Sequence, residues 1–293
     1  MEWWQALVLG LVEGITEYLP VSSTGHLILA SAFLGLDGEE TKSAVDSFNI
    51  VIQGGAILAV LALYTQRVFQ MIRGVFGKDD AGRKLAINIV IAFLPAAVLG
   101  VMLDELIESL LFRPVPVLAA LFLGGIWMIW IDRSRLRAHR DESPDEAVTE
   151  GGGIEQLGWR GALAIGCFQV VAMWPGTSRS MMTIAGGTIV GLRPKDAAEF
   201  SFLLGLPTLG GACVYKLGKD LKEAQDTGRP NLIEQLGVTP TIVGIAVATV
   251  SAMIAVKWLV AFLQKHGLSS FGYYRIALTI VLGGLLLAGV DVF

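Results

Sequence analysis

Two acidic residues lie in an apolar segment near the start of the chain. Glu13 and Glu17 are four positions apart and precede Pro20, so a helix would place both carboxylates on one face. Two carboxylates stacked in this way repel each other unless a cation or a shared proton joins them. Their hard oxygen ligands suit a divalent cation, Mg²⁺ or Ca²⁺. The pair therefore predicts a metal site at Glu13 and Glu17.

Hydroxyl groups and a histidine follow directly after Pro20. Ser22, Ser23 and Thr24 are followed by His26, and a helix beginning there would put Ser23 and His26 on one face. This combination can supply a nucleophile together with an acid or base. Alternatively, Ser22 or Ser23 simply caps the helix that follows, as serine often does.

A second apolar segment contains an arginine in a similar setting. Arg179 follows Pro175 and Gly176, and it is flanked by three hydroxyl residues, Thr177, Ser178 and Ser180. A guanidinium supplies a planar fork of donors for phosphate oxygens, and a helix beginning after the proline adds free backbone N–H groups. This segment predicts an anion site. The alternative is an arginine whose side chain reaches the lipid headgroups.

Weaker candidates lie elsewhere in the chain. Gln53 could support the site from a neighbouring helix, and Glu199 is expected to cap the start of a helix. His139 falls in a polar stretch and is expected to be solvated. Cys167 and Cys213 lie in apolar stretches, where a thiol behaves as a small hydrophobe, so neither is assigned to a disulfide or a metal.

The composition is that of a membrane protein. Of 293 residues, 54% are hydrophobic and 16% are charged, and the mean hydropathy is +0.63; soluble proteins are far less apolar. A net charge of -4 without a basic helix gives no support for nucleic-acid binding. Six apolar stretches are long enough to cross a bilayer: Phe48 to Tyr64, Leu85 to Leu103, Val115 to Ile131, Phe200 to Tyr215, Thr241 to Trp258 and Ile276 to Val290.

The two interrupted segments divide the chain into similar halves. Residues 6–36 and 162–192 each break at a proline followed by hydroxyl residues, and each precedes three of the apolar stretches. Backbone broken at membrane depth needs protein or water around it, so these segments are predicted to be re-entrant helical hairpins. One hairpin with three spans is an odd number of crossings, so the halves are expected to have inverted topology. The predicted repeats are 1–131 and 160–293, joined by a cytoplasmic linker at 132–159.

The basic residues of the loops give the orientation. The loop 66–84 carries five Lys or Arg residues, and 132–160 carries five Arg residues. Basic loops are retained in the cytoplasm, so both are predicted to be cytoplasmic. The loop 104–113 has one basic residue and is predicted to lie outside.

Bringing the hairpins together would assemble the groups that phosphoryl transfer requires: carboxylates for a metal, hydroxyls, a histidine and an arginine. A site that opens sideways into lipid would suit an amphiphile, whose isoprenoid tail stays among the membrane lipids. A different class of function is transport, because secondary transporters also use inverted repeats and paired broken helices. The residue set favours an enzyme, since a serine, a histidine and metal-binding glutamates exceed what reversible binding needs.

Three motifs resemble those of a known family. Val12 to Leu27 is similar to the first signature of the bacterial undecaprenyl-diphosphate phosphatases, the bacitracin-resistance family. Pro175 to Ser180 resembles the second signature, and Glu199 to Leu204 a third stretch. The resemblance covers nearly the whole chain. One departure is Met181, where the family usually has glycine, and we expect it to crowd the backbone beside Arg179.

The resemblance implies hydrolysis of undecaprenyl diphosphate to undecaprenyl phosphate and phosphate, with a divalent cation, at the outer face of the bacterial plasma membrane. It implies that Glu13 and Glu17 are the acidic pair, that Ser23 is the nucleophile, and that His26 transfers protons. Arg179 would hold the phosphate. A metal-bound water in place of Ser23 would need the same residues, and a flippase without hydrolysis, a homo-oligomer and the chain length of the substrate all stay open.

Overall fold

The computed structural model describes residues 1–36, 38–138, 151–228 and 236–289. Its long elements are all helices: α1 (Trp3–Thr16), α2 (Ser23–Phe33), α3 (Glu39–Leu63), α4 (Thr65–Val75), α5 (Asp80–Leu111), α6 (Pro114–Ala138), the short 3₁₀ helix η1 (Ile154–Gln156), α8 (Trp159–Val171), α9 (Arg179–Ile189), α10 (Pro194–Thr227), α12 (Val238–Leu263) and α13 (Ser269–Leu287).

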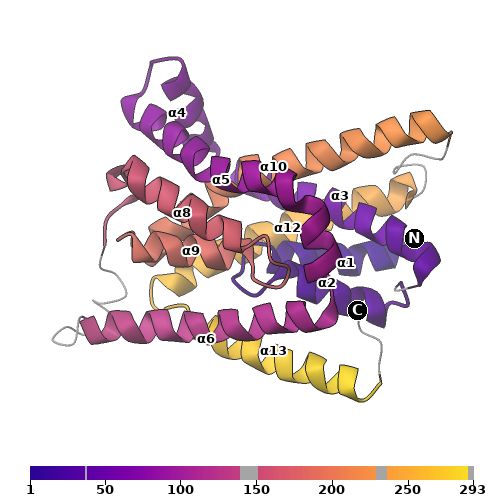
Figure 1. The fold of residues 1–293 in the computed structure, drawn as a ribbon. Helices are drawn as coiled ribbons and strands as arrows, with labels where there is room; N and C mark the ends of the chain where they lie inside the picture. Colours follow the sequence, from indigo (N-terminus) through magenta and orange to yellow (C-terminus); the bar gives the residue numbers. More distant parts are fainter. Residues whose placement is uncertain (37, 139–150, 229–235, 290–293) are drawn as a thin grey trace.

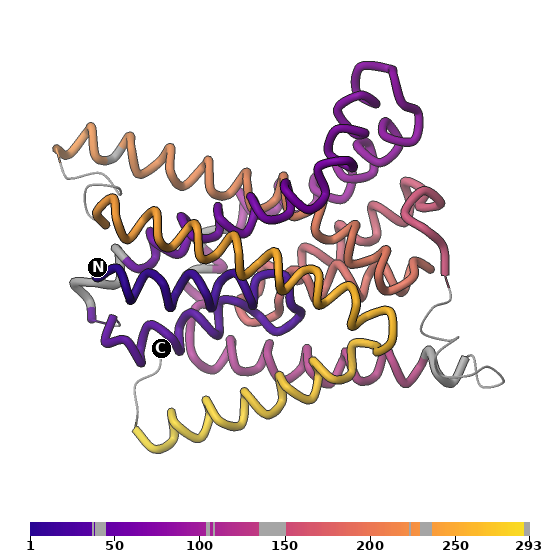
Figure 2. Tube along the Cα trace, turned by 180° about the vertical axis from the view of Figure 1, so that it is seen from behind, coloured from indigo at the N-terminus to yellow at the C-terminus, as the bar shows by residue number. Residues whose placement is uncertain are grey.

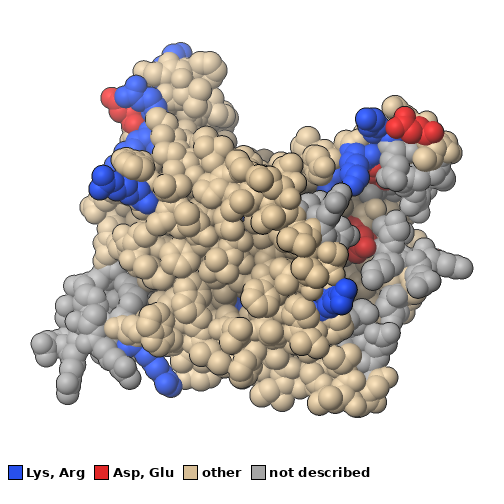
Figure 3. Space-filling view, in the orientation of Figure 1, with Lys and Arg blue, Asp and Glu red and all other residues tan. Residues whose placement is uncertain are grey.

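Six helices in the described part of the chain are long and apolar enough to cross a membrane. Their spans are Val45–Leu63, Asp80–Leu103, Pro114–Ser134, Pro194–Thr227, Val238–Leu263 and Ser269–Leu287. Each overlaps one of the six predicted stretches over most of its length, so the all-α, six-span prediction is confirmed. Figure 3 shows charged side chains gathered mainly toward the two ends of the helices, with a broad uncharged belt between them. The chain is a multi-pass membrane protein.

The two broken segments enter the helix bundle from opposite ends. In Figure 1, α1 and α2 extend from the end that carries the N-terminus, whereas α8 and α9 extend from the other end, and the breaks meet in the middle. Figure 2 shows the same arrangement from behind. The first helix of each broken segment packs mainly on a long helix of the other half. In the first segment α1 lies against α12, and in the second segment α8 lies against α5. The halves are therefore interlocked.

Small residues allow this interlocking. A Cβ on Gly10 would lie 2.6 Å from the carbonyl oxygen of Gly244, and one on Gly14 would collide with the carbonyl oxygen of Ala248. On the other side, a Cβ on Gly166 would lie 2.6 Å from Ala92 O. In a membrane, helices associate through such close backbone approach, since lipid supplies no hydrophobic driving force between them.

Several predicted loops are helical. Much of the predicted loop 66–84 is the helix α4 and the start of α5, and α6 continues beyond Ile131 to Ala138. The last part of the predicted linker is packed against the fold, because Gly152 N donates to Gly191 O and Arg193 N donates to Gly152 O. The end of the predicted linker is therefore ordered structure. His139 lies outside the described residues.

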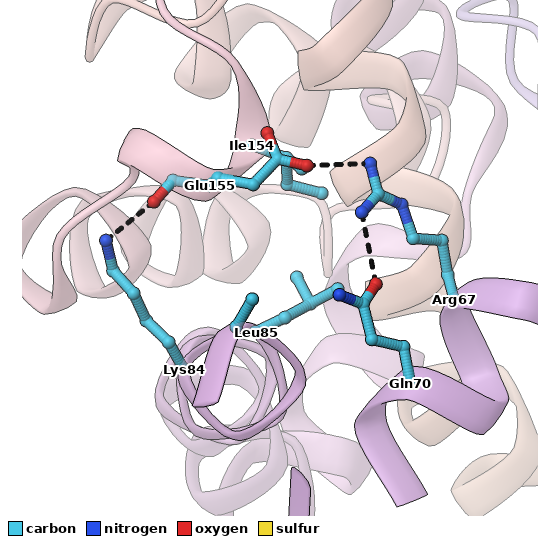
Figure 4. Close-up of a pocket in the computed structure, with 7 residues that line it drawn as sticks. Arg67, Gln70, Lys84, Leu85, Ile154 and Glu155 are labelled. Carbon is cyan, nitrogen blue, oxygen red and sulfur yellow. Dashed lines mark hydrogen bonds and ion pairs between the residues drawn. The ribbon is translucent and has the colours of Figure 1, made fainter. Parts of the chain in front are cut away.

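A polar cluster fixes the linker end to α4 and α5. Glu155 of η1 accepts a hydrogen bond from Arg67 of α4 at 2.9 Å, and its backbone carbonyl accepts one from Lys84 of α5 at 2.6 Å (Figure 4). These residues line a small cavity of about 90 Å³. Figures 1 and 2 place this cluster at the same end of the bundle as the C-terminal end of α6, so the two basic segments share one side.

Candidate active site

Each broken segment turns at a serine with an unusual backbone. Ser22 has φ 74° and Ser178 has φ 77°, a region that residues other than glycine rarely adopt. Each serine is the N-cap of the helix that follows, α2 or α9. The Ser178 hydroxyl accepts a hydrogen bond from Met181 N, whereas the Ser22 hydroxyl makes no capping hydrogen bond. The capping alternative was therefore wrong for the Ser22 side chain.

Hydroxyl groups join the two turns directly. Ser180 is fully buried and donates to the backbone oxygen of Leu19 at 2.9 Å. Its oxygen also lies 3.0 Å from that of Ser178. Thr177 is buried, and its backbone N–H donates to Trp174 O. Ser180 thus holds the second turn against the first, and Met181 packs in the main core.

Glu17 connects the two broken segments through its side chain. Ser23 Oγ donates to Glu17 Oε2 at 2.7 Å, and Arg179 Nη2 donates to Glu17 Oε1 at 3.2 Å. The Arg179 side chain is 10% exposed, so the alternative that it reaches the lipid headgroups was wrong. Its Nη1 donates to Ser201 O at 3.0 Å, while its buried Nε has no partner among the described residues. The guanidinium therefore has a donor left for a ligand.

Glu13 lies one helical turn before this cluster. Its side chain is 1% exposed, and its Oε1 has no hydrogen-bond partner within the described part of the chain. The backbone N–H of Glu17 donates to Glu13 O at 2.9 Å, so Glu17 is the C-cap of α1, one turn after Glu13. A buried carboxylate oxygen without a partner is costly, which makes this position suitable for a cation.

His26 lies beside the cluster and has other partners. Its Nδ1 lies 2.7 Å from Ser22 O, and its Nε2 lies 2.7 Å from the hydroxyl of Tyr274. Because a carbonyl oxygen only accepts, Nδ1 carries the proton, and Nε2 of the neutral ring accepts from Tyr274. The rings of His26 and Tyr274 also stack at 5.7 Å. Ser23 is thus paired with Glu17 rather than with His26.

The remaining candidates have different positions. Gln53 on α3 accepts a weak hydrogen bond from Cys213 of α10 at 3.7 Å, and Thr24 lies half-buried in the first turn of α2. Glu199 lies inside α10, which begins at Pro194, and it pairs with Arg67 at 2.7 Å. The prediction that Glu199 caps a helix start was wrong.

Arg275 is a central residue that the sequence interpretation missed. It is 0% exposed and donates to four backbone oxygens: Pro20 O at 3.5 Å, Ala120 O at 3.0 Å, Leu121 O at 3.2 Å and Gly176 O at 2.8 Å. Pro20 and Gly176 belong to the two turns, so one guanidinium holds both. The sequence places Arg275 at the edge of an apolar stretch, where it resembles a loop residue. The signal that could have identified Arg275 is an ionisable residue within a membrane-spanning helix, here α13.

The cluster has the groups that a hydrolytic reaction on a phosphate requires. Glu17 can receive the proton of Ser23, and Arg179 can stabilise negative charge next to both. All three side chains come from the broken segments, and Arg275 and Ser180 hold those segments together.

Comparison with known proteins assigns the family. The model of the bacitracin resistance protein BacA family matches residues 6–281. The chain belongs to this family. The match begins within α1 and ends within α13, so it includes both halves of this BacA-family chain.

Curated relatives of this BacA-family chain are similar over nearly their whole length. A protein of Sorangium cellulosum is 43% identical over 95% of this chain and 84% of its own. One of Pseudomonas aeruginosa strain UCBPP-PA14 is 43% identical over 94% and 92%, and one of Bordetella petrii is 38% identical over 97% and 96%. All three are named undecaprenyl-diphosphatase.

Proposed function

We propose that this protein hydrolyses undecaprenyl diphosphate to undecaprenyl phosphate and inorganic phosphate. This reaction would recycle the lipid carrier of cell-wall synthesis and would counter bacitracin, for which the family is named. The curated relatives carry the name of this activity. The observation that carries the proposal is the contact of Ser23 and Arg179 with the same carboxylate, that of Glu17.

In the proposed reaction, Ser23 Oγ attacks the terminal phosphorus of the diphosphate. Its proton passes to Glu17, whose Oε2 already accepts that hydrogen bond. The bond between the terminal phosphorus and the bridging oxygen breaks, and undecaprenyl phosphate leaves. Water then hydrolyses the phosphoserine. If water attacks the diphosphate directly instead, Glu17 is again the base that takes the proton.

Arg179 would bind the phosphate oxygens on which charge develops. Its guanidinium is already oriented by Ser201 O and Glu17, so little reorganisation is needed when substrate binds. His26, with its hydrogen bond from Tyr274, would exchange protons with the oxygens of substrate or product. Thr24 and Gln53 would contact the diphosphate beyond this centre.

The residues present fit a divalent cation. Glu13 offers a buried oxygen that has no partner among the described residues, and Glu17 lies one turn away. Within the described chain, no group of three or more His, Cys, Asp or Glu side chains gathers around a common point. Two glutamates with diphosphate oxygens and water would therefore complete an oxygen site for Mg²⁺ or Ca²⁺. Such an ion would neutralise part of the charge of the diphosphate.

The site would lie in the bacterial inner membrane with its entrance on the outer side. The end that carries Arg67 and Lys84 would face the cytoplasm by the rule of basic loops. The hairpin α1–α2 would then enter from outside and α8–α9 from the cytoplasm, as two inverted repeats. Undecaprenyl diphosphate would keep its tail among the membrane lipids.

Phosphate release by the purified protein is the direct test. Undecaprenyl diphosphate in detergent should yield phosphate and undecaprenyl phosphate in equal amounts, and a chelator should stop the reaction. Binding of the lipid without phosphate release, together with its movement across proteoliposomes, would contradict hydrolysis and favour a transporter.

A further inference from the structure

A second cavity lies between α5 of the first half and α8 and α10 of the second half. It has a volume of about 420 Å³, and residues of α5, α8 and α10 line it. Arg179 lines this cavity, whereas Glu13, Glu17 and Ser23 do not. Much of the wall is apolar and includes Phe93, Val101 and Met173. The cavity thus shares the arginine of the candidate active site and is otherwise built from different residues.

Its polar wall residues include two buried donors without partners. Gln169 is 2% exposed, and its Oε1 accepts a hydrogen bond from Thr208 at 3.3 Å, but its Nε2 has no partner among the described residues. The same is true of the buried Nε of Arg179. Lys216 adds an exposed cation to the lining, which includes no carboxylate. Buried donors need acceptors, so the ligand that fits must bring oxygens.

The two halves differ in one informative residue. Gln169 has the same position relative to Ser178 that Glu13 has relative to Ser22, and each lies near the end of the first helix of its broken segment. The first half therefore has a carboxylate where the second has an amide that donates. A pair of carboxylates suits a cation, whereas an amide beside a guanidinium suits an anion.

We propose that this cavity is a second binding site, which takes a phosphate monoester group on the side of Arg179 away from the catalytic serine. This proposal extends the proposed function and rests on it, because hydrolysis of the diphosphate would generate a phosphate monoester beside Arg179. Gln169 Nε2 and Arg179 Nε donate to the phosphate, and Lys216 attracts it. The apolar wall along α5 suits a hydrocarbon chain, so we assign the site to the lipid product. Inorganic phosphate shares the headgroup chemistry and lacks the chain.

Equilibrium binding without turnover tests this site. Farnesyl monophosphate and inorganic phosphate are titrated separately into the purified full-length protein by calorimetry. Gln169→Leu removes the unpaired donor at similar volume, and Gln169→Glu replaces it with a negative charge at the same shape. Each should weaken farnesyl monophosphate binding by about tenfold or more, since a hydrogen bond to a charged group is lost.

A steric pair of variants supplies a matched control. Gly211 lines the cavity, and a Cβ there would have Phe93 Cζ, at 4.0 Å, as its nearest atom; Gly211→Leu therefore fills the cavity without a backbone clash. Gly210 is its neighbour on α10, does not line the cavity, and has open space around a Cβ. Gly211→Leu should lose farnesyl monophosphate binding by about tenfold or more, and Gly210→Leu should bind as the wild type does.

The outcomes separate the sources and the two proposals. If inorganic phosphate binds as tightly as farnesyl monophosphate and shows the same losses, the site takes released phosphate and the assignment to the lipid is overturned. If Gln169→Glu and Gly211→Leu bind both ligands as Gly210→Leu does, the cavity is not a phosphate site. The protein could bind farnesyl monophosphate through Gln169 and yet never hydrolyse the diphosphate. That result would overturn the proposed function and leave this binding site in place.

Discussion

The carboxylate of Glu17 lies 3.2 Å from the guanidinium of Arg179, although 162 positions separate the two residues in sequence. Glu17 belongs to the broken segment of α1 and α2, and Arg179 belongs to that of α8 and α9. Each exposes a tenth or less of its side chain, so the ion pair is shielded from water. Electrostatic interactions are stronger in such a site than in water. This contact makes one site from two halves, and it is the point at which substitutions should be most informative.

Arg179→Lys keeps the positive charge and loses the planar fork that reaches Glu17 and Ser201 O together. A preorganised charged donor contributes to the transition state, so kcat should fall by roughly 10² to 10³ with a smaller change in KM. Steady-state kinetics of phosphate release measure both kcat and KM. Arg160→Lys, an exposed arginine on α8, is the matched control, and equal losses in both variants would contradict the role of Arg179.

Ser23→Ala removes the hydroxyl that donates to Glu17. If Ser23 is the nucleophile, turnover should fall on the order of 10³-fold or more, because the covalent route is lost. Ser22→Ala should cost far less, since its hydroxyl makes no capping hydrogen bond. Rapid quench with labelled diphosphate should trap phosphate on the wild-type protein. Near-normal turnover by Ser23→Ala would favour attack by water instead.

Glu13→Gln and Glu17→Gln should each lower activity on the order of 10²-fold, because each removes one of the two carboxylates proposed to hold the cation. Chelator should silence the wild type, and added Mg²⁺ or Ca²⁺ should restore it. Asp80→Asn, at a carboxylate that is 92% exposed, serves as the control. Full wild-type activity in chelator would remove the metal from the proposal.

Arg275→Met should destabilise the protein by at least about 3 kcal/mol, because four buried carbonyl oxygens lose a charged donor. The turns at Pro20 and Gly176 would also separate, so activity should fall along with stability. Thermal unfolding in detergent gives the first quantity and phosphate release the second. The control is Arg133→Met, which removes an exposed arginine whose guanidinium donates to the Tyr273 hydroxyl at 3.3 Å. An unchanged melting temperature for Arg275→Met would refute its structural role.

A cysteine at Ser134 tests the orientation in the membrane. Ser134 lies near the C-terminal end of α6, at the same end of the bundle as α4 and η1, which is proposed to be cytoplasmic. In a variant lacking Cys167 and Cys213, Ser134→Cys should stay unmodified when an impermeant thiol reagent is added outside intact cells. Ser109→Cys, in the segment predicted to lie outside, should react. The reverse pattern would invert the proposed topology.

The sequence by itself determined the class of protein and most of the candidate site. Apolar runs as long as a bilayer predict spans because the thickness of the hydrocarbon core sets helix length, and a helix long enough to cross a membrane overlaps each of the six predicted stretches. Glu17, Ser23 and Arg179 could be selected because charged and hydroxyl residues beside a proline are exceptional at membrane depth. These signals are local, and local patterns are what a sequence displays directly.

The tertiary structure decided how these residues are paired. The spacing of Ser23 and His26 suggests a pair, yet Ser23 donates to Glu17, and His26 contacts Tyr274 on a distant helix. In the sequence Arg275 resembles a loop residue, whereas in the structure the packing of α13 buries it against both turns. Partners of this kind depend on which helices lie side by side, and the interlocking of the two halves through small residues sets that arrangement. No spacing along one segment can reveal it.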